Sequence, residues 1–123
     1  MIETLSIEDI IYCYEEGVHV KLYSHLPRSL DIEQLKAYHQ RGSYDPGEKK
    51  VAIYLSHITD LADYKTTLFH ELAHAIDDLL FDEASSEEQI EQIGLQTYQQ
   101  NPQLYDFIKG IFKLPNTRFE RIE

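Results

Sequence analysis

The sequence predicts a small α+β domain, and three observations carry this prediction. The chain has 123 residues, a length that suits one domain. Residues 18–23 and 50–57 alternate between apolar and polar side chains, as half-buried strands do. Residues 63–80 repeat their apolar side chains every three or four positions, as an amphipathic helix does. We therefore expect residues 1–123 to form one domain, with a short β-sheet packed on this helix and further helices toward the C-terminus.

The N-terminal part is predicted to form a helix and then a strand. Ser6 followed by Asp9 resembles a capping box, so a helix should begin there, and Gly17 should end it. The alternating residues 18–23 follow as the first strand.

The middle of the chain is predicted to form a second helix and a hairpin. This helix should begin at Ser29 or Asp31 and end at Gly42. The stretch 42–48 is rich in turn-forming residues, so Tyr44 should pair with the second strand across a turn.

The C-terminal part is predicted to be helical. After the helix at 63–80, Ser85 or Ser86 should begin a third helix that runs to about Gln100. A short helix should follow the break at Asn101-Pro102, and a last helix should begin after Pro115.

Composition excludes several classes of partner. Asp and Glu number 22 against 11 Lys and Arg, which gives a formal net charge of −11. Such a charge opposes binding to nucleic acids and to anionic membranes. No signal peptide and no apolar run of membrane-spanning length is visible. We therefore expect a cytoplasmic protein, with secretion as the alternative if an export signal has been removed.

The clearest chemical motif is His70-Glu71-Leu72-Ala73-His74, within the best-predicted helix. Residues four apart lie on one face of a helix, so both imidazoles can bind one Zn²⁺. Glu71 is rotated by about 100° from His70, and from there it can take a proton from a water on the metal without binding the metal itself. The motif therefore predicts one zinc ion per chain, with Glu71 as general base in the hydrolysis of a peptide or protein substrate.

A catalytic zinc site also needs a third protein ligand. No histidine follows His74, so the third ligand should be a carboxylate or a residue upstream of the motif. The downstream candidates are Glu87, Glu88, Glu91, Asp106, Glu120 and Glu123. Asp77 and Asp78 follow the motif closely, and either could orient a ligand imidazole through its other ring nitrogen.

Residues 53–57 and 66–78 resemble the catalytic domain of the anthrax lethal factor family, to which Pro-Pro endopeptidases are also related. The shared pattern is H-E-x-[GA]-H-A-[VI]-D-D, which is complete here at residues 70–78. The resemblance implies a small zincin-like fold and a zinc metalloendopeptidase. It also implies that the third ligand is a Glu about forty residues after the second histidine, which selects Glu120, with Glu123 as the alternative.

Two other functions and one substrate-binding hypothesis remain open. The family has a Tyr about two turns before its ligand Glu, and residues 112–116 contain none. A catalytically degenerate zincin that binds zinc or a peptide is therefore one alternative. An intracellular protease of the type that cleaves phage repressors is the other. If the protein is a peptidase of either family, the strand Val51–His57 is a candidate edge strand that would pair with an extended substrate.

Overall fold

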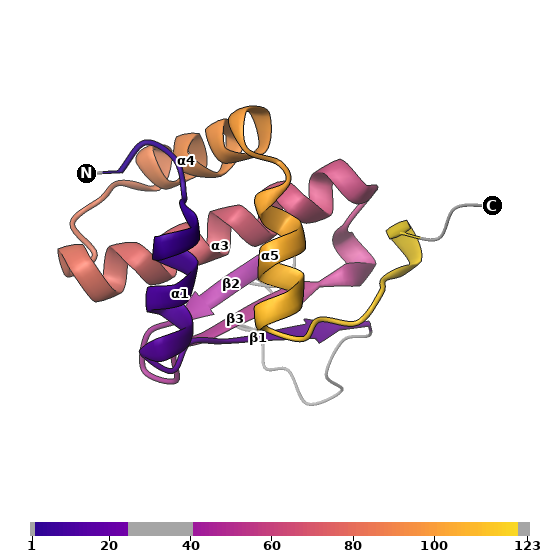
Figure 1. Ribbon diagram of the computed structural model, residues 1–123, viewed down its shortest axis with the longest axis horizontal. Coiled ribbons are helices and arrows are strands. Elements are labelled where there is room, and N and C mark those ends of the chain that lie inside the picture. The colour runs from indigo at the N-terminus through magenta and orange to yellow at the C-terminus, as the bar shows by residue number, and fades with distance from the viewer. Residues whose placement is uncertain (1, 25–40, 121–123) are drawn as a thin grey trace, which may run out of the picture.

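Figure 1 shows the computed structural model of the protein, which describes residues 2–24 and 41–120. Within these ranges the chain forms a small α+β fold with four α-helices and a three-stranded mixed sheet. The α+β class predicted from the sequence is therefore confirmed. The second predicted helix begins at Ser29 or Asp31 and so lies outside the described residues.

The first helix, α1 (Ile7–Glu15), begins where the sequence predicts. The Ser6 hydroxyl accepts a hydrogen bond from the Asp9 backbone N–H, and the Asp9 carboxylate accepts one from the Ser6 N–H. This reciprocal capping box satisfies two backbone donors that the first turn leaves free. Gly17 follows the helix with a φ of 90°, a conformation that favours glycine.

The sheet has the strand order β1-β3-β2. Strand β3 (Lys50–Tyr54) is central, with β1 (His19–Tyr23) parallel to it on one side and β2 (Gly42–Asp45) antiparallel on the other. The predicted hairpin is confirmed, because Tyr44 pairs with Val51.

Two predictions about these strands are wrong. Gly42 begins a strand rather than ending a helix. The strand predicted to end at His57 is not an edge strand: β3 ends at Tyr54, the 3₁₀ turn η1 (Leu55–His57) follows, and β3 has a neighbour on each side. The antiparallel strand beside the motif helix is β2, one of the two edges of the described sheet.

Helix α3 (Leu61–Phe81) is the longest helix and carries the histidine motif. The Asp60 carboxylate caps its first turn by accepting from the Asp63 N–H. The predicted apolar face is buried, with Leu68, Leu72 and Ile76 each 0% exposed. Helix α3 contacts β2 and β3, so it holds its motif beside the sheet (Figure 1).

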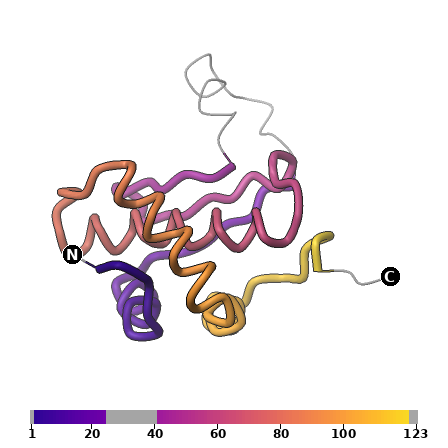
Figure 2. Tube along the Cα trace, turned by 90° about the horizontal axis from the view of Figure 1, so that it is seen from above, coloured from indigo at the N-terminus to yellow at the C-terminus, as the bar shows by residue number. Residues whose placement is uncertain are grey.

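Two further helices and a short turn complete the fold. Helix α4 (Glu87–Gln100) packs along α3, and α5 (Leu104–Ile111) lies beside α1, as Figure 2 shows. The helix predicted after Pro115 is, as far as the chain is described, the single 3₁₀ turn η2 (Arg118–Glu120). None of the described helices is long and apolar enough to cross a membrane.

Candidate metal centre

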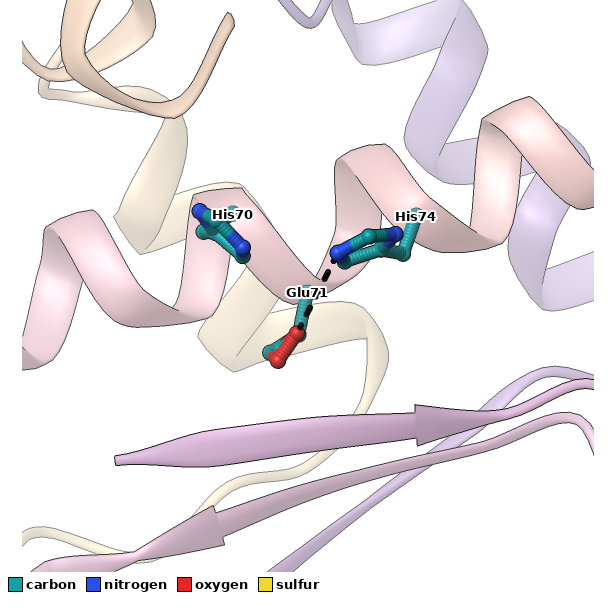
Figure 3. Close-up of side chains that lie close together, drawn as sticks. All are labelled: His70, Glu71 and His74. Atoms are coloured by element: carbon teal, nitrogen blue, oxygen red, sulfur yellow. Dashed lines mark ion pairs between the residues drawn. The ribbon is translucent and has the colours of Figure 1, made fainter. Parts of the chain in front are cut away.

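His70 and His74 lie one turn apart on α3, and both side chains are partly accessible to solvent. Their ring centroids are 5.0 Å apart. Among the described residues, His70, Glu71 and His74 form one group of potential metal ligands, each offering an atom within 4.8 Å of the others. Figure 3 shows both imidazoles and the intervening carboxylate along one stretch of the helix. The motif predicted from the sequence is therefore assembled in a form that could hold a metal ion.

Glu71 differs from the two histidines in its surroundings. Its side chain points from α3 toward the strands and is 4% exposed (Figure 3). Burial, together with the negative charge of Glu87, raises the pKa of Glu71 to about 8. One carboxylate oxygen lies 4.0 Å from Nε2 of His74. Glu71 is thus a buried carboxyl group held beside the two histidines.

Glycine allows the edge strand to approach Glu71 closely. A Cβ atom on Gly42 would lie 2.9 Å from Cγ of Glu71 and 2.9 Å from the Ala52 carbonyl oxygen. Any side chain at residue 42 would therefore displace the carboxylate or the strand. The motif H-E-x-x-H says nothing about this glycine, which sequence reasoning assigned to a helix end.

Glu87, at the start of α4, contacts both histidines. Its Oε1 lies 2.9 Å from Nε2 of His70, and its Oε2 lies 3.2 Å from Nε2 of His74. Burial and the neighbouring His74 lower the pKa of His70, and this outweighs the opposing influence of Glu87. A neutral imidazole is the form that binds metal ions. Two imidazoles and a carboxylate therefore meet here, a donor set that suits zinc.

The packing of α4 on α3 brings Glu87 to this place. A Cβ on Gly94 would lie 3.2 Å from both N and Cα of His70, so the two helices touch at the first histidine. Asp77, which is 5% exposed, accepts a hydrogen bond from the Ser85 N–H in the loop before α4. These contacts fix where α4 begins relative to the motif.

The sequence offers Asp77 or Asp78 as a residue that could orient a ligand imidazole, and the hydrogen bonds of both carboxylates in the structure have other partners. Asp77 binds the loop before α4, as described above. Asp78 accepts a hydrogen bond of 2.8 Å from the Tyr44 hydroxyl, which joins the edge strand to α3. Both acids thus position neighbouring elements of the site.

The structure does not bring Glu120 to the histidines. Its Oε1 accepts hydrogen bonds from the Tyr105 hydroxyl and from Thr117, and its Oε2 pairs with Lys109. Turn η2 is anchored beside the start of α3 by Arg118, which donates to carbonyl oxygens between the sheet and that helix. Unlike Glu87 and Glu91, Glu120 does not line the cleft described below. The alternative ligand, Glu123, lies outside the described residues.

The other candidate ligands differ in whether they line the cleft that contains the histidines. Glu91 is exposed, one turn after Glu87, and lines the same cleft, where its charge acts on His70. Glu88 lines a different surface pocket, near Ile2. Asp106 is exposed on α5 and does not line the cleft.

The histidines open into a cleft of about 960 Å³. Arg41 and the first three residues of β2 form one wall of the cleft. Helix α3 lines it with His70, Glu71 and His74 together with Asp63, Thr66 and Thr67. Helix α4 lines it with Glu87, Glu91 and Leu95. Among the described residues that line the cleft, Arg41 is the one arginine or lysine, and its Nε lies 3.2 Å from the Asp63 carboxylate.

Comparisons of the chain with protein-family models, with curated proteins and with solved structures found no match. Any assignment of function to this site therefore depends on its own geometry and chemistry.

Proposed function

We propose that this protein is a zinc-dependent peptidase with a zincin-like fold, related in architecture to the lethal factor group that residues 70–78 resemble. One observation carries the proposal: two accessible imidazoles and a buried carboxylate from consecutive turns of one helix converge at the base of a large cleft. A helix used only for packing has no need to gather three ionisable groups beside a cavity.

His70 and His74 would hold the metal through their Nε2 atoms, together with a third carboxylate. When bound there, zinc supplies a Lewis acid that lowers the pKa of water and polarises the substrate carbonyl. Glu71 accepts the proton of the attacking water on its carboxylate and returns it to the leaving amine. Its burial beneath the histidines supports this role, because a desolvated carboxylate is a stronger base than an exposed one.

Strand β2 supplies a means of binding an extended peptide. It is an edge of the sheet as described, and it lines the cleft beside the motif. Unpaired backbone groups on such an edge can bind a substrate strand in the manner of an added β-strand. Gly42 lets this edge lie close to Glu71, so a peptide paired with β2 would pass near the general base. In this proposal, the substrate therefore pairs with residues 42–45 and not, as the sequence predicts, with residues 51–57.

The test is hydrolysis of a mixed peptide library by the zinc-loaded protein, analysed by mass spectrometry. The matched control is Glu71→Gln, which keeps the shape of the side chain and removes its basicity. We expect cleavage by the parent protein and a rate lower by roughly 100-fold or more in Glu71→Gln, the usual contribution of a general base. A zinc-loaded protein that cleaves no peptide, or equal rates in the two proteins, would contradict the proposal.

A further inference from the structure

We propose that Glu87 is the third protein ligand of the metal, so that α3 and α4 together form the complete site. The inference rests on the proposed function, because it concerns the same metal. Glu87 lies in the first turn of α4, where the helix dipole alone favours an acidic residue. The structure adds a contact that this explanation does not require.

The contact has the dimensions of a ligand set. Two atoms that each lie about 2.1 Å from a tetrahedral ion are about 3.4 Å apart. The oxygen atoms of Glu87 lie 2.9 Å from Nε2 of His70 and 3.2 Å from Nε2 of His74. The same two nitrogens are the ones that would bind the metal, so Glu87 needs only a small displacement to join them around one ion.

The start of α4 is held firmly enough to place this carboxylate. The Ser86 hydroxyl accepts from the Gln89 N–H, and the Gln89 side chain accepts from the Ser86 N–H, which fixes the first turn. Asp77 holds the preceding residue, Ser85, and Gly94 keeps α4 in contact with His70. Three hydrogen bonds and one close helix contact thus fix the backbone that carries Glu87.

The neighbouring acids on α4 fit the role less well. Glu91 lies on the same face one turn later and lines the cleft, but the ion pairs of the two histidines are with Glu87 and Glu71. Glu88 is next to Glu87 but lines another pocket. Glu91 is therefore better placed to face the substrate in the cleft, and Glu88 offers a matched control within the same helical turn.

The experiment measures metal affinity rather than activity. Zn²⁺ binding is determined by competition with a chromophoric chelator, and the visible absorption of bound Co²⁺ reports the coordination number. The proteins are the full chain and its variants Glu87→Gln, Glu88→Gln, Glu91→Gln and Glu87→His. Circular dichroism of the metal-free proteins establishes that each variant is folded.

We expect Glu87→Gln to lower zinc affinity by more than the roughly 100-fold that loss of an outer partner of a ligand can cost. The intense absorption of four-coordinate Co²⁺ should be lost in this variant and recovered in Glu87→His, because imidazole is also a ligand. Glu88→Gln should bind as the parent does. A large loss in Glu91→Gln with normal binding in Glu87→Gln would overturn the inference in favour of Glu91.

The inference and the proposed function can fail separately. Unchanged affinity in all three Gln variants would overturn the role of Glu87 while leaving a zinc site on the histidines. No binding of either metal by the parent protein would overturn both proposals.

Discussion

Replacing Gly42 with Ala would place a methyl group between the edge strand and the proposed general base. The added carbon would lie 2.9 Å from Cγ of Glu71 and 2.9 Å from the Ala52 carbonyl oxygen. Carbon atoms in ordinary contact are about 3.5–4.0 Å apart, so the strand and α3 must separate, or Glu71 must move, by roughly 0.6 Å or more. The residue is not among the positive-φ positions of the chain, so the strain is steric.

This displacement has two measurable consequences. Overpacking of this kind costs about 1–3 kcal/mol, which corresponds to a decrease in melting temperature of roughly 3–12 °C in a domain of this size. A displacement of about 1 Å in a catalytic group can lower the rate by about 100-fold. Because Glu71 is not a proposed ligand, zinc affinity should change by much less than the rate.

The assay compares kcat, zinc affinity and thermal unfolding of the parent, Gly42→Ala and Gly110→Ala. A Cβ on Gly110 meets nothing within 4 Å, so that variant should retain its activity and gain up to about 1 kcal/mol from its helix. A folded Gly42→Ala protein with parental kcat would refute the view that the close approach of β2 positions Glu71.

Three further predictions concern stabilisation by zinc, the loop before α4 and the pH dependence of stability. Zinc at 100 times its dissociation constant should stabilise the protein by about 2.7 kcal/mol, seen as a higher melting temperature that a chelator reverses; an unchanged melting curve would argue against binding to the folded state. Asp77→Ala should destabilise the fold by about 1–3 kcal/mol in urea unfolding, because the partly buried Ser85 N–H loses its hydrogen bond to a charged acceptor, and should weaken zinc binding; parental values of both would exclude a role in placing α4. Burial alone would raise the pKa of Glu120. Hydrogen bonds from Lys109, Thr117 and Tyr105 together lower this pKa by more than burial raises it, so the pKa in the folded protein lies below the ordinary value of 4.5. The stability that Glu120 contributes is therefore present above pH 4.5 and lost as the pH falls through the folded pKa. Urea unfolding of Glu120→Gln should show a deficit at pH 7 that narrows below pH 4.5, with zinc content unchanged, whereas loss of zinc in this variant would restore Glu120 as a ligand.

The sequence predicted the features that depend on local signals. The capping box at Ser6, the 3.6-residue period of α3 and the turn before β3 are each encoded within a few residues, and the structure has all three. The three clustered motif residues were predicted for the same reason, because residues one turn apart on a helix are necessarily neighbours.

The features that the sequence did not predict depend on contacts between distant segments. Strand order decides which strand is an edge, and no period within residues 51–57 reveals that β1 and β2 pair on either side of β3. The choice of Glu120 came from a count along the chain that assumed a last helix beside the motif, whereas η2 is anchored elsewhere by Arg118. A small residue at position 94, one turn after Glu91 and two turns after Glu87, was the available signal for close packing of α4 on α3.

The most direct test of the account is the zinc content of the protein purified without metal-affinity resin, measured by elemental analysis beside a His70→Ala/His74→Ala double variant. Both histidines are partly exposed, so the double variant should fold. We predict close to one zinc ion per chain in the parent protein and none in the double variant. Zinc absent from the parent even after incubation with the metal, or retained equally by the double variant, would contradict the proposal that this helix is a metal centre.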